Sequence, residues 1–454
     1  MKKLVYIFIL LISIQIFQSC EKMIEIDLPT DQINTENVFK DKRSATAALT
    51  NLYINLRETS IYSGNSQGIG SELGLYTDEL EPISIPPTYD SALLYNNNID
   101  PTRLVLTTFW DTSYAHIYAI NSFIVGVTKS TGILEEEKKE LIAEGYVIRA
   151  MYYQALTQLF GEIPYTTSTD YKFNTTIKKI APIEVLNNLE QDLLITLETL
   201  TYNDRSANKY YVNKAVAELI LAKNYLLQKR YDKAEIYARH VMDNPLYSLE
   251  TDLSLVFKNT AKSTLWQLSN NNPTSATYEA SNYIMLVDDW LYKLSSSLLS
   301  SFESNDLRKL SWIKEYSTNG TTSFNYKYKN NINNTDECSI LFRIEETYFI
   351  LSEALIYQNR EKEAIDYLNK IRQRAGLTNL PNSLSNEETL LAMLQESKKE
   401  FFLEHARRFF DLKRNNKLSL LKSSKPNWQD KHALLPYPEK ELLINPNLNP
   451  QNEY

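Results

Sequence analysis

The chain has 454 residues, of which 43% are hydrophobic and 23% charged, with 31 tyrosines, 10 glycines and two cysteines. A chain of this length buries a large core, and its ordinary apolar content excludes an intrinsically disordered protein. The formal net charge of −8 and the lack of a basic stripe argue against a nucleic-acid partner.

The first twenty residues resemble the signal of a bacterial lipoprotein. Two lysines precede an apolar run over 4–17, which is too short for a membrane span. The run ends in Gln-Ser-Cys, similar to a lipobox, although the residues before the serine depart from the usual ones. We predict that 1–19 is a cleaved signal peptide and that Cys20 carries lipid. An uncleaved anchor and a soluble signal with a chance cysteine are the alternatives.

The other cysteine, Cys338, would be the only thiol besides the lipidated one. The mature chain therefore cannot form an internal disulfide. No pattern of histidine or asparagine marks Cys338 as a nucleophile, so we expect it to be a small buried side chain.

Helical periodicity dominates the chain from its first hundred residues onward. Apolar residues recur every three or four positions over 117–127 and 148–159, and Pro182 opens a third such segment. Two later segments, 214–242 and 344–375, each carry two small residues twelve positions apart. At this spacing the helices of a tetratricopeptide-type hairpin press together, and only a small side chain fits. The pairs are Ala222 with Ala234, and Ser352 with Ala364.

Two irregular blocks interrupt this helical pattern, at about 59–108 and about 246–340. The first is rich in glycine, proline and asparagine, and the second in serine, asparagine, threonine and tyrosine. Short strand-like runs occur in the second block at 263–268 and 323–328. Because long irregular segments in compact proteins usually carry function, we expect the ligand site there.

No pattern indicates catalysis. The chain lacks His-Glu-x-x-His and Cys-x-x-Cys, and its four histidines are widely separated, so we expect no metal and no cofactor. The glycine-spaced stretch 68–74 has one residue too many for a dinucleotide loop and is interpreted as a flexible turn. A glycoside hydrolase needs two carboxylates that face each other across a cleft. Adjacent pairs such as Glu345-Glu346 cannot do so, and this pair is expected to open a helix.

The aromatic residues are the better indication of function. Trp110, Tyr114 and Trp266 lie in regular patterns and are expected in the core. Other aromatic rings lie beside amides and carboxylates in the irregular blocks, an arrangement that suits sugar recognition. There the ring covers the apolar C–H face and the polar groups bind the hydroxyls. The candidate ligand contacts are Tyr89, Tyr95, Tyr278, Tyr283 and Trp290.

Several ordered segments resemble the SusD/RagB family of outer-membrane lipoproteins. They extend from just after the lipid site to the last residues and are specific in combination. They are Asn37-Val38-Phe39-Lys40, Arg149-Ala150-Met151-Tyr152-Tyr153, Leu159-Phe160-Gly161-Glu162-Ile163-Pro164-Tyr165, Asp306-Leu307-Arg308, Ser352-Glu353-Ala354 with 369–377, Arg407-Arg408-Phe409-Phe410-Asp411-Leu412-Lys413-Arg414, and Asn445-Pro446-Asn447-Leu448.

The resemblance implies a mainly α fold. Four tetratricopeptide-like helical hairpins would pack against an irregular, loop-rich ligand-binding part with a few short strands. The mature chain, 20–454, would be one SusD-like domain. Its helical frame is expected at about 36–58, 109–245 and 341–420, with ligand-binding insertions at 59–108 and 246–340.

The resemblance also implies a function without catalysis. Family members capture oligosaccharides or other nutrients at the cell surface of Bacteroidota and act as a lid over a SusC-like TonB-dependent transporter. We therefore expect a surface-exposed lipoprotein, held in the outer membrane by the lipid on Cys20. The alternatives are a lipid-anchored surface glycan hydrolase and a helical-repeat scaffold that binds protein but no small ligand.

Overall fold

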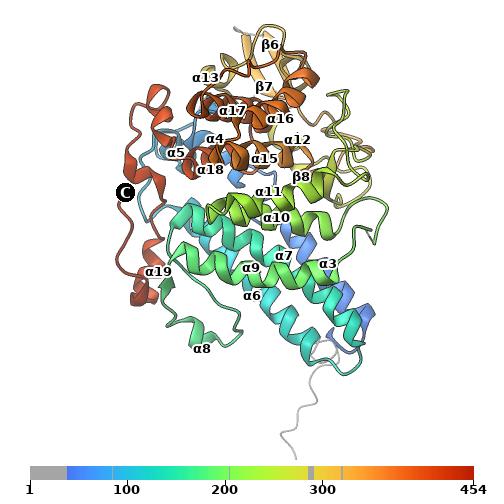
Figure 1. The fold of residues 1–454 in the computed structure, drawn as a ribbon. Helices are drawn as coiled ribbons and strands as arrows, with labels where there is room; N and C mark the ends of the chain where they lie inside the picture. Colours follow the sequence, from blue (N-terminus) through green and yellow to red (C-terminus); the bar gives the residue numbers. More distant parts are fainter. Residues whose placement is uncertain (1–37, 84, 204, 285–290, 318–320) are drawn as a thin grey trace, which may run out of the picture.

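A computed structural model describes residues 38–83, 85–203, 205–284, 291–317 and 321–454. Helices form most of the molecule, as expected (Figure 1). No helix in the described ranges is long and apolar enough to cross a membrane. The longer helices are α3 (Lys42–Glu58), α6 (Leu104–Lys129), α7 (Glu135–Phe160), α9 (Pro182–Thr199), α10 (Lys214–Leu227), α11 (Tyr231–Met242), α15 (Glu345–Tyr357), α16 (Glu361–Arg374) and α17 (Asn386–Phe401).

Local sequence explains where several of these helices begin and end. The Asp41 carboxylate caps α3 by accepting the Ser44 N–H at 2.8 Å, and Ser385 caps α17 in the same way. Pro182 occupies the first turn of α9, where its missing N–H costs nothing. α7 ends at Gly161, whose φ of +78° strains any residue with a side chain.

The two segments with paired small residues form helical hairpins, α10 with α11 and α15 with α16. Ala222, Ala234, Ser352 and Ala364 are all fully buried. The Ser352 hydroxyl donates to the carbonyl of Ala364 at 3.3 Å, so these helices touch where the small residues were predicted to lie. The tetratricopeptide-like character of these hairpins stays a prediction.

The described residues contain four pairs of short strands, one of which joins the two irregular blocks. β4 (Thr264–Leu268) pairs with β8 (Ser339–Arg343), and β6 (Ile313–Ser317) pairs with β7 (Thr321–Asn325), all antiparallel. β2 (Ile163–Pro164) pairs with β3 (Lys179–Ile180). β1 (Leu80–Pro82) pairs with β5 (Tyr292–Leu294), so the first block joins the second across more than two hundred residues of sequence. β4 confirms the strand-like run predicted at 263–268, whereas β7 covers only 323–325 of the run predicted at 323–328.

The interpretation of 68–74 as a flexible turn is wrong. Ile69–Tyr76 form a buried helix, α4. A Cβ atom on Gly70 would lie 2.8 Å from the carbonyl oxygen of Leu403, and one on Gly74 would lie 2.7 Å from the Leu403 side chain. The glycine spacing therefore allows α4 to pack closely against the turn that follows α17. Trp110, Trp266 and Cys338 are buried, as expected, and Tyr114 packs partly buried against the core.

A buried charge network joins the second irregular block to the helices. Arg308, at the start of α14 (Leu307–Trp312), is fully buried and binds Asp306, Glu396 and Glu400 at 2.5–3.2 Å. Glu400, on α17, also forms an ion pair with Arg343 of β8 at 2.6 Å. The Asp306-Leu307-Arg308 motif thus has a structural role.

The C-terminal segment, residues 418–454, follows α18 (Arg407–Arg414). It runs along one side of the molecule (Figure 1). This segment contains short 3-10 turns and α19 (Glu439–Ile444). It is part of the core, because Leu421, Leu435 and Tyr437 are fully buried.

Candidate functional site

A polar groove of about 590 Å³ opens where β1 meets β5. The two irregular blocks and the C-terminal segment supply its walls. The groove follows from the antiparallel strand pairing, because Leu80 pairs with Leu294 and brings Asp78, just before β1, beside the serines after β5. Its lining comprises Asp78, Leu80, Glu81, Tyr95, Ser295, Ser296, Ser297, Ser300, Ser423, Ser424 and Lys425.

Among the described residues that line this groove, Tyr95 is the aromatic one. It is the last residue of α5 (Asp90–Tyr95), and Lys425 holds it in place. The Lys425 ammonium lies 3.7 Å from the centre of the Tyr95 ring and donates to the carbonyls of Leu75, at 2.6 Å, and Tyr95, at 3.0 Å. Burial lowers the pKa of Lys425 to about 7. The tyrosine ring is therefore fixed against a lysine that is only partly charged at neutral pH.

The acidic residues beneath the groove are compensated within the protein. Burial alone would raise the pKa of Asp78, but Arg408 and Lys398 outweigh it and hold that pKa well below its ordinary value. Both cations contact the Asp78 carboxylate, at 2.9 and 2.8 Å. Burial raises the pKa of the neighbouring Glu79 to about 8, and the Asp78 charge adds to this effect. Glu79 is therefore mainly neutral at pH 7.

Serine side chains line the groove, and hydrogen bonds hold the serine segments in place. Ser295 donates to the Asp78 carbonyl at 2.6 Å and caps α13 (Ser296–Leu299). The Ser296 N–H and hydroxyl both donate to Glu81, at 2.9 and 3.0 Å. Hydroxyls, one aromatic ring and paired charges suit a neutral ligand rich in hydroxyl groups. A charged ligand would have to compete with the internal ion pairs.

The structure places the other predicted contacts in different surroundings. Tyr89 is 60% exposed just before α5, outside the groove lining. Tyr278 donates its hydroxyl to Glu58. Tyr283 is buried, with its hydroxyl 2.7 Å from that of Ser71, so its ring is not available to a ligand in this conformation. Trp290 and Cys20 lie outside the described residues.

Sequence reasoning missed Lys425 and the serines of the groove. Ser295 to Ser297 and Ser423 to Lys425 lie about 130 residues apart, and neither group has a periodic pattern. The only signal was the high serine content of the second block, which was noted for the block as a whole. Only the strand pairing and the path of the C-terminal segment bring these residues together.

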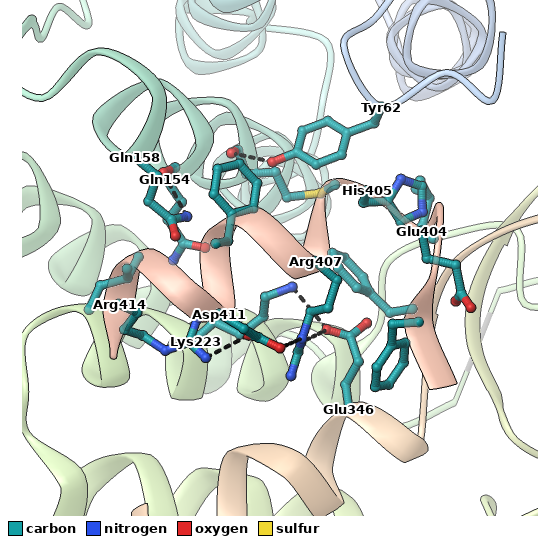
Figure 2. A pocket seen from close by; sticks show the side chains of 16 residues that line it. Tyr62, Gln154, Gln158, Lys223, Glu346, Glu404, His405, Arg407, Asp411 and Arg414 are labelled. Carbon is teal, nitrogen blue, oxygen red and sulfur yellow. Dashed lines mark hydrogen bonds and ion pairs between the residues drawn. The ribbon is translucent and has the colours of Figure 1, made fainter. Parts of the chain in front are cut away.

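A smaller cavity of about 60 Å³ lies between α7, α10, α15 and α18 (Figure 2). Its charged side chains bind one another. Glu346 forms ion pairs with Lys223 at 2.9 Å and with Arg407 at 3.1 Å. Arg407 also forms an ion pair with Asp411 at 2.9 Å. A space of this size holds a few water molecules and no nutrient. We interpret it as part of the packing between the helices.

Within the described ranges, no group of three or more histidine, cysteine, aspartate or glutamate residues could hold a metal ion. The free thiol that the structure describes, Cys338, is buried, and burial raises its pKa, which disfavours the reactive thiolate.

Two family models match separate parts of the chain. One, described as the SusD family, matches residues 300–454. The other, described as starch-binding associating with outer membrane, matches residues 30–226. SusD-like protein P2 of Formosa agariphila is 26% identical over 416 residues, which span 77% of this chain and 80% of that protein.

Solved structures share the fold. A SusD superfamily protein from Bacteroides vulgatus has a TM-score of 0.79 at 18% identity, covering 91% of this chain and 99% of its own. Surface glycan-binding protein A from Bacteroides thetaiotaomicron, in complex with laminarihexaose, has a TM-score of 0.75 at 18% identity and the same coverage. The expected mainly helical, SusD-like fold is confirmed.

Proposed function

We propose that this chain, a member of the SusD family, captures neutral oligosaccharides at the cell surface and does not cleave them. The observation that carries the proposal is the groove beside the β1–β5 pair, which is lined by serine hydroxyl groups and by the ring of Tyr95, held by Lys425. An aromatic face buries the C–H face of a sugar, and the serine oxygens, whose protons are donated within the protein, can accept hydrogen bonds from its hydroxyls.

The charge distribution supports a neutral ligand. Asp78 is already bound by Arg408 and Lys398, and Glu81 lies 3.5 Å from Lys293. Lys425, the cation among the described residues that line the groove, already donates to two backbone carbonyls, and burial lowers its pKa to about 7, so it attracts a sulfate or uronate group only weakly. A relative with the same fold binds laminarihexaose, a neutral oligosaccharide, which agrees with this class of ligand.

We further propose that the protein delivers its ligand to a SusC-like TonB-dependent transporter and is held at the outer membrane by the lipid on Cys20. The family description, which includes association with the outer membrane, supports this location. Co-purification of a barrel protein after mild detergent extraction is expected, and its absence from intact membranes would contradict the partner.

Calorimetric titration tests the binding function. Laminarihexaose and maltohexaose are suitable neutral probes, and we expect at least one to bind. Tyr95→Ala should then weaken binding by about tenfold or more, because a central aromatic contact is removed. Phe173→Ala, which removes an exposed ring on α8 (Tyr171–Asn174), is the matched control and should bind as the unmodified protein does.

The other candidate contacts can be ranked by the same titration. Alanine variants of Tyr89, Tyr278, Tyr283 and Trp290 show which of them contribute, and circular dichroism checks that each still folds. A protein that binds no member of a broad panel of neutral oligosaccharides would refute the proposed function. The appearance of new reducing ends during incubation would refute the statement that it does not cleave them.

A further inference from the structure

A second groove, of about 390 Å³, lies on another part of the surface, between α6, the loop around α8 and the C-terminal segment. One face of α6 contributes Trp110, Tyr114 and Tyr118, the loop contributes Tyr171, and α19 contributes Ile444. Figure 1 shows α8 and α19 on the same side of the molecule. The volume falls in the range of sites for small molecules.

Hydrogen bonds fix the walls of this second groove. The Asn121 amide donates to the carbonyl of Thr166 at 2.9 Å, and the Thr166 hydroxyl donates to Asn174 at 2.7 Å. Asn445 ties the C-terminal segment to the loop by donating to the carbonyl of Ile177 at 2.8 Å. The groove is thus held open by the protein itself, which reduces the entropic cost of binding a ligand.

Two rings of the groove are exposed. The Tyr118 side chain is 48% exposed and that of Tyr171 is 68% exposed, and they come from different walls, α6 and α8. Tyr114, in contrast, uses its hydroxyl to bind the carbonyl of Pro164 at 2.8 Å, so its role is structural. Exposed aromatic faces on two walls can hold the apolar face of a flat ligand.

Carboxylates at the rim define the chemistry further. Asp111 and Glu441 both line the groove, and Lys440 lies 3.6 Å from Asp111. Burial and the charge of Asp111 raise the pKa of Glu441. These two oxygen-rich groups accept hydrogen bonds from hydroxyls and repel sulfate, phosphate or uronate groups.

The geometry points to a second binding site for a neutral oligosaccharide in this groove, with the Tyr118 and Tyr171 rings as stacking surfaces and the Asp111 and Glu441 carboxylates as hydroxyl acceptors. The site rests on the proposed function, because it would bind the same class of ligand. The C-terminal segment borders both grooves, through Lys425 at one and Glu441 at the other.

Stoichiometry tests this inference. With laminarihexaose or maltohexaose in native mass spectrometry and calorimetry, we expect about two equivalents per chain. The double variant Tyr118→Ala/Tyr171→Ala should lose one of them and keep the other. Tyr95→Ala should have the complementary effect. Phe173→Ala, which alters the same short helix as Tyr171 but not the groove lining, should keep both, and thermal melts check that each variant folds.

The outcomes separate the two proposals. A single equivalent that Tyr95→Ala removes and the double variant leaves unchanged would refute the second site alone. A single equivalent with the opposite dependence would support the second site and refute the first groove. Binding of neither probe by the unmodified protein would count against both. Unchanged sugar binding, together with loss of a co-purifying barrel protein in the double variant, would make this surface a protein contact and overturn the inference.

Discussion

Glu79 lies buried beneath the first groove, where its carboxyl group accepts the Leu403 N–H at 3.4 Å. Burial and the charge of Asp78 raise its pKa to about 8, whereas an unfolded chain has a glutamate pKa near 4.5. Between these values the unfolded state releases a proton that the folded state keeps. The contribution of Glu79 to folding stability is therefore complete below about pH 4.5 and is lost as the pH rises through about 8.

Glu79→Gln should remove this pH dependence, because glutamine is a neutral group of the same shape. The free energy of unfolding from urea denaturation should fall less between pH 5 and pH 8.5 in the variant, by about 2–4 kcal/mol. Glu198→Gln, at an exposed position on α9, is the control and should follow the unmodified protein. Parallel pH curves for the unmodified protein and Glu79→Gln would contradict the raised pKa.

At the scale of elements, local patterns predicted the hairpins but not the packing of α4. The spacing of Ala222, Ala234, Ser352 and Ala364 lies within single segments, so periodicity alone could reveal it. Gly70 and Gly74 contact Leu403, more than three hundred residues later. No short-range pattern encodes such a contact, and the glycines were consequently interpreted as a turn. The same reason explains why Tyr95 was identified as a candidate while its partner Lys425 was not.

The α15–α16 hairpin offers a direct test of close packing. Ala364→Leu should destabilise the protein by about 1–3 kcal/mol, because Ala364 is fully buried and its carbonyl contacts Ser352. Lys362→Leu adds a similar side chain at an exposed position of the same helix and serves as control. Urea denaturation measures both. Equal stability of the two variants would show that the hairpin has room at Ala364.

For the whole molecule, the buried charge network joins the second block to the helices. Arg308→Met removes three ion pairs and leaves Glu396 and Glu400 buried with fewer partners. We expect a loss of about 3–5 kcal/mol in the free energy of unfolding, since breaking a buried pair leaves uncompensated charge. The exposed pair of Lys139 with Glu136 is the comparison, and Lys139→Ala should leave the denaturation midpoint unchanged. A stable Arg308→Met protein would show that the network is dispensable.

The position of the C-terminal segment has a consequence for how the protein becomes active. Residues 418–454 leave the ribosome after every helix from α3 to α18, yet they supply a wall to both grooves. Neither groove is complete on a nascent chain that lacks this segment, however much of the helical part has already formed. A chain interrupted before Lys425 would lack one wall of each groove, so ligand recognition depends on residues that are synthesised after the helices from α3 to α18.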